Sequence, residues 1–281
     1  MLVFPNFDPV AFSIPTFFWG PLSVRWYALA YLTGFVLGWR LALWLADRGP
    51  AIAHKPSRRD YDDFISWGVL GVVLGGRIGY VLFYNAPYYL DHPVEALHIW
   101  QGGMSFHGGL LGMVTAIIWF TRARRINTLA FGDVAATVAP IGLALGRIAN
   151  FINGELVGRP VDNPASVPWA MVFPRVDDLP RHPSQLYEAG LEGVLLFTIM
   201  MAAISCPKIR RRPGLALGIF TCFYAIFRAT AELFRTPDAQ LGFLTEGLTM
   251  GQILCLPMLL VGLWLIVRAL CKPRADLVAA A

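Results

Sequence analysis

Seven apolar stretches, each long enough to cross a lipid bilayer as a helix, are the feature that most limits how this 281-residue chain can fold. A membrane-spanning helix needs about 20 mostly apolar residues. Charged residues make up 15% of the chain, well below the share of about 25% that is usual in soluble proteins. We therefore predict an all-α polytopic membrane protein with a single transmembrane domain over residues 1–281. Its predicted spans are 18–46, 64–85, 104–121, 131–152, 186–206, 214–235 and 248–270.

Basic residues between the spans predict how the chain is oriented. Of its 23 lysines and arginines, 14 follow the first, third, fifth or seventh span, whereas three lie in a loop on the opposite side. Because cytoplasmic loops are enriched in lysine and arginine, we expect the N-terminus outside and the C-terminus in the cytoplasm. The loop 153–185 on the outer side is polar and rich in proline. We expect it to form a small irregular cap over the outer face.

Arginines within the predicted spans point to a polar chamber. An ionised side chain inside a bilayer is costly and usually faces the interior of a bundle or a wet cavity. Arg40 lies near the cytoplasmic end of its span and can extend its charged group to the membrane surface. We expect the other arginines to face one chamber in the outer half of the membrane. They are Arg25, Arg77, Arg147, Arg228 and Arg235.

The sixth span carries a polar stripe. Tyr224, Arg228, Glu232 and Arg235 follow one another at helical spacing, so their side chains lie on one face. These groups could pair only with one another to lock the bundle, since buried ion pairs are often structural. The five arginines, however, exceed the two nearby carboxylates, which belong to Glu155 and Glu232. This excess of positive charge predicts an anionic ligand.

His107 and the cysteines lead to different expectations. His107 opens the third span from the outer side. A lone histidine is more often structural, but among several arginines its neutral imidazole can accept a proton near neutral pH. The cysteines, Cys206, Cys222, Cys255 and Cys271, have no metal-binding spacing and are expected to be unreactive thiols. We predict no metal site and no cofactor.

Several blocks of the sequence resemble one family. The run GRIANFINGELVG at 146–158 is similar to the signature of the prolipoprotein diacylglyceryl transferases, which are bacterial inner-membrane enzymes. Further similar blocks, in the family's order, are RWYA at 25–28, GGRIGY at 75–80, FHGGLLG at 106–112, HPSQLYEA at 182–189 and YAIFRATAELFRTPD at 224–238. The first of these blocks departs from the family pattern at Ala28, where the pattern has glycine.

The resemblance implies an activity. Such an enzyme moves the diacylglyceryl group of phosphatidylglycerol to the thiol of a lipobox cysteine in a prolipoprotein signal peptide. Glycerol 1-phosphate is released, and lipoprotein maturation begins. The partners would be phosphatidylglycerol and the prolipoprotein. Nucleic acid is not expected as a partner for a separate reason, because the positive charge does not lie in a soluble domain with interleaved aromatic residues. The protein would lie in the inner membrane with its active site in the outer half, facing the periplasm, which also makes the cap periplasmic.

Matching the motifs gives roles to individual residues. Arg147 and Arg228 would hold the phosphate, and His107 would accept the thiol proton. Glu155 would orient an arginine or a glycerol hydroxyl, and Glu232 would support Arg228. The implied catalytic set is His107, Arg147, Arg228, Tyr27 and Glu155. The implied set for binding phosphatidylglycerol is Arg147, Asn150, Gly158, Arg228, Glu232, Tyr224, Arg77 and Arg235.

Other functions fit the sequence less well. A transporter or flippase for an anionic lipid or metabolite is the main alternative, but it needs a path through both leaflets, whereas the intramembrane charges gather toward one side. A retinal-type receptor would need a lysine in the seventh span, which has none. An intramembrane serine protease could use Ser105 or Ser184 with His107, yet neither serine has the sequence context of such enzymes.

Overall fold

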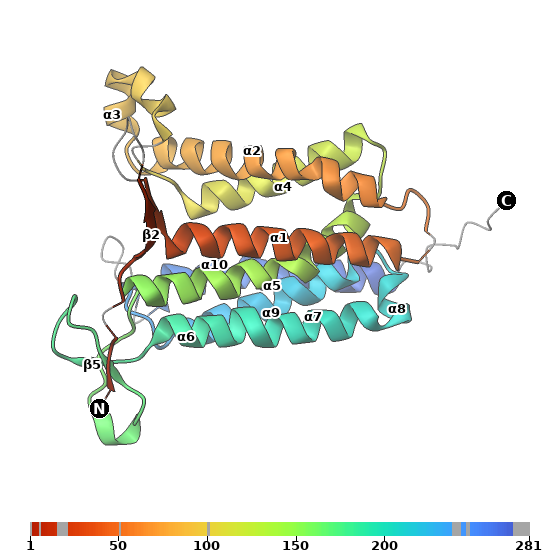
Figure 1. Cartoon of the computed structure of the whole chain (residues 1–281). Coiled ribbons are helices and arrows are strands. Elements are labelled where there is room, and N and C mark those ends of the chain that lie inside the picture. Colours follow the sequence, from red (N-terminus) through yellow and green to blue (C-terminus); the bar gives the residue numbers. More distant parts are fainter. Residues whose placement is uncertain are drawn as a thin grey trace. The chain divides into compact units, whose positions relative to one another are not determined.

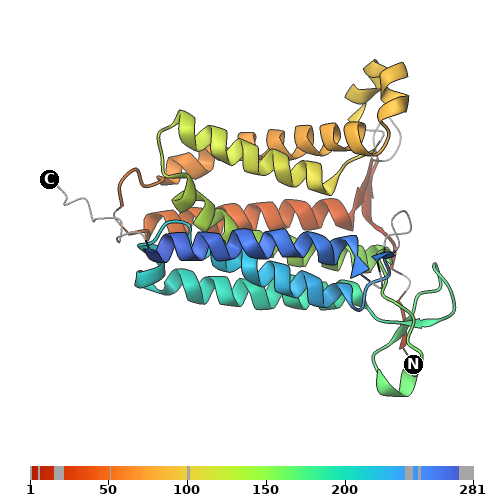
Figure 2. The same cartoon turned by 180° about the vertical axis from the view of Figure 1, so that it is seen from behind.

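The computed structural model describes residues 2–5, 7–15, 22–50, 52–99, 102–237, 243–245 and 248–271. Seven long helical rods dominate these residues (Figures 1 and 2). By length and composition, six of the rods can cross a membrane. The seventh rod, α4, includes His107 and Arg122. The rods are α1 (Trp26–Asp47), α2 (Arg58–Phe83), α4 (Phe106–Ala123), α5 (Thr128–Asn153), the continuous rod Ser184–Ser205, α9 (Leu215–Glu232) and α10 (Met250–Cys271).

The predicted class of an all-α polytopic membrane protein is confirmed, but the predicted start of the first span is wrong. Helix α1 begins at Trp26. The preceding residues Leu22–Arg25 form strand β3, which pairs antiparallel with β2 (Val10–Ile14). The predicted residues 18–21 lie outside the described residues.

The chain divides into two compact units. The first comprises Met1–Leu41 and Asp133–Arg274, and the second comprises Ala42–Gly132 with Ala275–Ala281. The second unit holds α2, α4 and, between them, the short helices α3 (Ala86–Asp91) and η1 (Pro93–Leu97). The first unit holds most of α1 and α5 and all of the later helices.

Glycines allow α2 and α4 to pack backbone against backbone in the second unit. A Cβ atom at Gly75 would lie 2.7 Å from the Cα of Gly112 and closer still to the carbonyl oxygen of Gly108. Real Cβ atoms do not approach this closely, so a side chain would force the helices apart. The two helices can therefore approach this closely only because glycine occupies these positions. Small residues at such positions are typical of helix packing in membranes.

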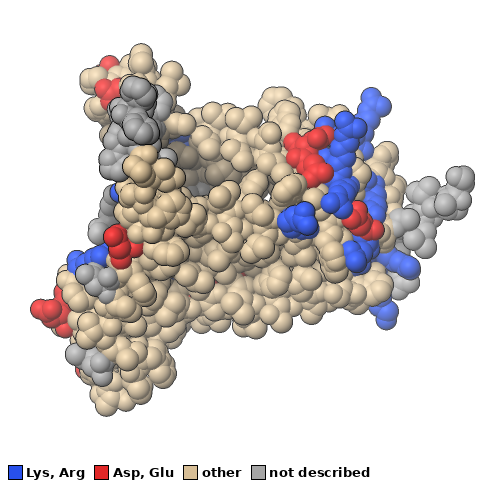
Figure 3. Space-filling model, in the orientation of Figure 1, with Lys and Arg blue, Asp and Glu red and all other residues tan. Residues whose placement is uncertain are grey.

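Most basic residues of the second unit gather at one end of this hairpin. Apart from the buried Arg77, its lysines and arginines precede α2, lie in the first turn of α2, or lie in the last turn of α4 or just after it. Figure 3 shows basic side chains gathered at this end. Ser57 and Asp60 form a reciprocal capping box at the start of α2, an arrangement that satisfies two otherwise unpaired backbone N–H groups. The helix therefore starts at a polar, capped end.

In the first unit, a buried carboxylate fixes the start of α9. Asp133 accepts hydrogen bonds from the backbone N–H groups of Gly214 at 2.8 Å and Leu217 at 2.7 Å. A carboxylate at a helix N-terminus also interacts favourably with the helix dipole. Helix α9 then packs closely on α10, where a Cβ at Gly218 would lie 2.9 Å from the carbonyl oxygen of Gly262.

The rod Ser184–Ser205 changes its winding along its length. It starts as α6 (Ser184–Glu188), continues as the π-helical segment η4 (Ala189–Leu195) and ends as α7 (Leu196–Ser205). Helix α8 (Pro207–Arg210) follows. π-helical turns are rare and are frequent at functional sites. The rod carries two acidic residues of the site described below, Glu188 at the end of α6 and Glu192 in η4.

The segment predicted as a cap folds together with the N-terminus of the chain. Strand β1 (Leu2–Val3) pairs in parallel with β4 (Met171–Val172), which pairs antiparallel with β5 (Pro180–Arg181). Phe4, Val157 and Phe173 form a small buried apolar cluster beside this sheet. The remaining elements are the turn η3 (Pro164–Ser166) and the strands β6 (Phe243–Thr245) and β7 (Leu248–Thr249).

Candidate functional site

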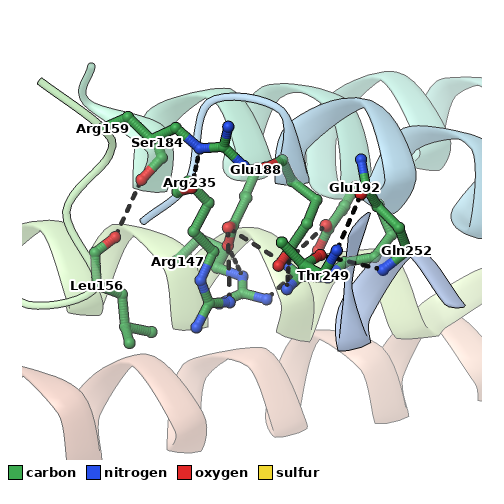
Figure 4. Close-up of polar contacts among 11 residues, drawn as sticks. Arg147, Leu156, Arg159, Ser184, Glu188, Glu192, Arg235, Thr249 and Gln252 are labelled. Atoms are coloured by element: carbon green, nitrogen blue, oxygen red, sulfur yellow. Dashed lines mark hydrogen bonds and ion pairs between the residues drawn. The ribbon is translucent and has the colours of Figure 1, made fainter. Parts of the chain in front are cut away.

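A buried cluster of charged side chains lies between three helical rods of the first unit, as Figure 4 shows. Helix α5 provides an arginine, the α6–η4 segment provides two glutamates, and α9 with the residues just after it provides the rest. Every side chain in the cluster is at most 17% exposed. We call these residues the ion cluster: Arg147, Glu188, Glu192, Arg228, Glu232 and Arg235.

Glu188 lies at the centre of the ion cluster. Its Oε2 is 2.6 Å from Nε of Arg147, and its Oε1 is 3.2 Å from Nη1 of Arg228. The same Oε1 is 3.9 Å from Nη1 of Arg235. One carboxylate thus contacts guanidinium groups from two helices and from the segment that follows α9. Its side chain is 1% exposed, so these contacts form away from water.

The other two carboxylates complete the pairing. Glu192 lies 3.6 Å from both Arg147 and Arg228, and Glu232 lies 2.6 Å from Nη2 of Arg228. The cluster therefore contains as many carboxylates as arginines. The predicted excess of buried positive charge is wrong for these residues, because Glu188 and Glu192 were not counted among the carboxylates. Their spacing of four residues within an apolar span was the signal that could have found them.

Glycines make room for the carboxylates. A Cβ at Gly251, in the first turn of α10, would lie 2.8 Å from the carboxyl carbon of Glu232. Gly193 in η4 fits against Ala144 of α5, where a Cβ would lie 2.5 Å from the alanine Cβ. Thr249 and Gln252 exchange hydrogen bonds at the start of α10 (Figure 4). The glycine contacts hold α10 against α9 and η4 against α5 around the ion cluster.

The turn after α5 is held by polar side chains from two directions. Asn150 donates from Nδ2 to Oε1 of Glu155 at 2.8 Å. From the other side, Gln185 donates to the carbonyl oxygen of Glu155 at 2.6 Å, and Ser184 donates to that of Leu156 at 3.0 Å (Figure 4). Leu156 has φ +56°, which non-glycine residues rarely adopt. The structure thus brings Asn150 and Glu155 together in a strained turn that α6 supports.

Gly158 is required by the path of the backbone. Its N–H donates to the carbonyl oxygen of His182 at 3.0 Å. A Cβ at Gly158 would lie 2.6 Å from the carbonyl oxygen of Phe234 and closer still to that of His182. Three chain segments therefore meet at a position where only glycine fits. Next to it, Arg159 donates to the carbonyl oxygens of Arg235 at 2.9 Å and Glu232 at 3.3 Å.

Sequence reasoning missed this structural role of Arg159, which it placed only in a loop. The same region holds two titratable groups outside the predicted spans. Arg181 binds the Asp177 carboxylate and lowers the pKa of that group below its usual value. Burial lowers the pKa of His182, whose Nδ1 lies 3.1 Å from the hydroxyl oxygen of Tyr187.

The two tyrosines of the implied site lie in the same unit as the ion cluster. The hydroxyl oxygens of Tyr27 and Tyr31 are 3.0 Å apart on α1. Tyr27 interacts electrostatically with Arg147 and Glu155. Tyr224 interacts electrostatically with members of the ion cluster on three rods. Both phenols therefore lie close enough to the charged groups to interact with them electrostatically.

Two of the arginines expected at the chamber, Arg25 and Arg77, do not join the ion cluster. Arg25 ends strand β3 and is exposed, so it is not within a membrane-spanning helix as predicted. Arg77, in the second unit, is buried and donates to the backbone carbonyl oxygens of Glu95, Ala96, Gly102 and Gly103. It thus holds the segment between η1 and α4.

His107 also belongs to the second unit. It lies in the first turn of α4 and is exposed. Ser105 caps this helix by accepting a hydrogen bond from the N–H of Gly108 at 3.1 Å, so its hydroxyl is engaged structurally. Within the described part of the chain, no group of three or more His, Cys, Asp or Glu side chains is arranged to hold a metal ion.

Comparison with known proteins decides the family. The model of the prolipoprotein diacylglyceryl transferase family matches residues 9–268. The chain belongs to this family. The resemblance predicted from the sequence motifs is therefore confirmed. Family membership, together with the apolar helices, makes the chain a multi-pass protein of the bacterial inner membrane.

Curated relatives are similar over almost their whole length. The chain is 56% identical to the phosphatidylglycerol–prolipoprotein diacylglyceryl transferase of Azospirillum brasilense, over 98% of both chains. The protein of the same name from Gluconacetobacter diazotrophicus is 52% identical, over 97% of this chain and 94% of the relative. That from Rhodopseudomonas palustris is 53% identical, over 93% and 90% respectively.

Proposed function

We propose that the protein transfers the diacylglyceryl group of phosphatidylglycerol to the cysteine thiol of a prolipoprotein, the reaction for which its relatives are named. The acceptor is the lipobox cysteine, and the phosphate leaves as glycerol 1-phosphate. The observation that carries this proposal is the ion cluster, whose Arg147 lies within the run that resembles the family signature. The site lies in the outer half of the membrane and faces the periplasm, with segment 153–185 as its cap.

The chemistry requires a site for a leaving phosphate. The thiol loses its proton, and the sulfur forms a bond to the glycerol carbon. The bond between that carbon and the phosphate oxygen breaks, and its electron pair stays on the phosphate. Donors aimed at the position where charge develops usually contribute most to catalysis. Arginine suits this task because its planar fork binds phosphate through two N–H groups.

Charge balance in the ion cluster gives the carboxylates a positioning role. Glu188, Glu192 and Glu232 hold Arg147 and Arg228 in fixed orientations before any lipid binds. A guanidinium has five N–H donors, so each arginine retains donors for a phosphate. Arg147 and Arg228 are 17% and 14% exposed, which leaves a small part of each accessible. The arginines therefore act as preorganised donors rather than as surplus charge.

The remaining residues of the implied site have supporting roles in this proposal. His107 accepts the thiol proton, and the phenols of Tyr27 and Tyr224 donate hydrogen bonds to the substrate. The strained turn held by Asn150 and Glu155 shapes the headgroup site, and Gly158 lets three chain segments meet beside it. Arg235 provides a third guanidinium group that can donate to the phosphate. Arg77 acts indirectly, because its hydrogen bonds hold the segment between η1 and α4 in place.

Replacement of Arg147 tests the proposal. Purified protein is mixed with phosphatidylglycerol carrying a radiolabelled diacylglyceryl group and a peptide with a lipobox cysteine. We expect Arg147→Ala to slow transfer by about 10²- to 10³-fold, the usual effect of removing one such donor. Arg147→Lys keeps the charge but loses the fork and should also be slow. Arg40→Gln, at an exposed position on α1, is the control. A folded Arg147→Ala variant with normal transfer would exclude the role of this arginine.

A further inference from the structure

The second unit contains an open pocket that shares no residue with the ion cluster. It lies where α4 ends and the chain turns into α5, and its volume is about 370 Å³. Figure 3 shows basic side chains gathered at this end of the α2–α4 hairpin. The pocket is lined by His54, Thr121, Arg122, Arg125, Ile126 and Asn127.

The pocket is positively charged. Arg124, between the two arginines that line it, binds Asp63 at 2.6 Å and Asp60 at 3.3 Å. Two acidic side chains of α2 are thus already paired with Arg124. Among the residues that the structure describes, neither Arg122 nor Arg125 forms an ion pair, and both are exposed. Two guanidinium groups are therefore available at the pocket.

The backbone at Arg125 indicates that this side chain has a use. The N–H of Arg125 donates to the carbonyl oxygen of Arg122, and that of Ile126 donates to the carbonyl oxygen of Thr121. This is the Schellman pattern of helix ends, in which the residue at the position of Arg125 is left-handed and usually glycine. Arg125 has φ +56°. The chain places arginine where glycine would be less strained, and strained residues cluster at binding sites.

A second strained residue and a free donor lie in the same pocket. His54 has φ +54°, and its carbonyl oxygen accepts a hydrogen bond from the N–H of Asn127 at 2.8 Å. The Asn127 side chain accepts from the N–H groups of Leu129 and Ala130 through Oδ1. Within the described residues, its Nδ2 makes no hydrogen bond. The pocket thus offers amide and guanidinium donors together, which is the chemistry that recognises a phosphate.

The surroundings indicate that the phosphate belongs to a lipid. Trp119 lies one helical turn before Arg122 and is 64% exposed, and its ring centroid is 6.2 Å from that of Trp67. Tryptophans of membrane proteins are enriched at the level of the lipid headgroups. Leu70, Leu74 and Leu111 continue the exposed apolar surface along the hairpin. The pocket therefore opens at the border between a lipid-facing surface and a basic helix end.

We propose that this pocket binds the phosphate of an anionic phospholipid headgroup through Arg122, Arg125 and Asn127. Basic pockets between transmembrane helices are suited to such headgroups. The lipid bound here is not the one whose diacylglyceryl group is transferred, so the proposal is independent of the proposed reaction. It would tie the α2–α4 hairpin to the surrounding lipid.

Lipid binding to the full-length protein in detergent tests the proposal. The probe is dioctanoyl phosphatidic acid, and native mass spectrometry counts the bound molecules. We expect the Arg122→Gln/Arg125→Gln variant to bind one lipid fewer than the unmodified protein. The charge-matched control is Lys208→Gln/Arg211→Gln, which removes two exposed basic residues from the first unit and should bind the full number. Equal numbers for the pocket variant and the unmodified protein would overturn the proposal.

Two further probes identify the ligand. Dioctanoyl phosphatidylcholine, whose headgroup is zwitterionic, should not fill the pocket, and filling by this lipid would contradict recognition of an anionic headgroup. Inorganic phosphate at the concentration of the lipid should not displace phosphatidic acid. Displacement would make free phosphate the ligand and overturn the assignment to a lipid.

Arg125→Gly separates a binding role from a structural one. Because glycine is favoured in the left-handed conformation, we expect the lipid-free variant to unfold at the same or a higher temperature than the unmodified protein. It should nevertheless lose the bound phosphatidic acid. A lower unfolding temperature with lipid binding retained would show that Arg125 stabilises the turn and would overturn its role in binding.

Discussion

Glu188 links the three arginines of the ion cluster, because its two carboxylate oxygens contact the guanidinium groups of all three. Removing one partner of a buried ion pair costs about 3–5 kcal/mol, since the other charge is left uncompensated. Three arginines would then share two carboxylates. The geometry of Arg147 and Arg228 thus depends on a residue that we do not expect to react with substrate.

Glu188→Gln tests this dependence. The substitution keeps the shape of the side chain but removes its charge, so we expect a lower unfolding temperature and a transfer rate reduced at least about tenfold, or 1.4 kcal/mol. Glu188→Asp should restore part of the rate because it restores the charge. Asp162→Asn, at an exposed position, is the control. A Glu188→Gln variant with unchanged stability and rate would contradict the central position of this carboxylate.

His182 provides a prediction about pH. Burial lowers its pKa below the ordinary value of 6.5. The unfolded chain therefore binds a proton at a higher pH than the folded protein does, and stability is lost as the pH falls below the ordinary value. We expect NMR spectra of histidine-labelled protein to show a midpoint below 6.5, assigned with His182→Gln. A midpoint at or above the ordinary value would contradict burial of the ring.

Individual residues show where sequence reasoning succeeded and failed. The pairing of Glu232 with Arg228 followed from a spacing of four residues on one helix, and the structure shows it. Glu188 and Glu192 lie on another rod, and their meeting with Arg147 depends on how helices pack. The left-handed backbone of Arg125 could not be predicted either, because the left-handed residue at the end of a helix is usually glycine.

At the scale of elements, the α2–α4 hairpin gives a test of helix packing. We expect Gly75→Ala to destabilise the protein by about 1–3 kcal/mol, as overpacking usually does, because the new Cβ would collide with the backbone of α4. Gly142→Ala is the matched control, since a Cβ at Gly142 meets no atom within 4 Å. Alanine is favoured over glycine within helices, so this control should be neutral or stabilising. Thermal unfolding in detergent measures both variants, and equal stability would contradict the close approach.

Elements also differ in how far the sequence determines them. Apolar length predicted the helical rods, since each rod is a continuous run of residues suited to lipid. The start of α1 was misplaced because the apolar residues before Trp26 continue into a strand that pairs with β2. The π-helical winding of η4 has no signal in hydrophobic periodicity. Gly193, which lets η4 approach Ala144, indicates that tertiary packing determines this segment.

At the scale of the whole molecule, the reaction needs no thiol of the enzyme itself. All four cysteines are free, and Cys222 and Cys255 are buried. In the proposed mechanism the nucleophile is the cysteine of the prolipoprotein. We expect a variant with the four cysteines replaced by alanine or serine to keep most of its transfer activity. Loss of activity in a folded variant would indicate a covalent intermediate on the enzyme.

The variant without cysteines also allows a test of orientation. The excess of basic residues on one side predicts that residues around Lys208 face the cytoplasm and that segment 153–185 faces the periplasm. Asp162→Cys and Lys208→Cys each introduce one thiol at an exposed position. A maleimide that cannot cross the inner membrane should label Asp162→Cys in cells with a permeable outer membrane. It should label Lys208→Cys only after lysis, and the opposite pattern would invert the topology and place the cap on the cytoplasmic side.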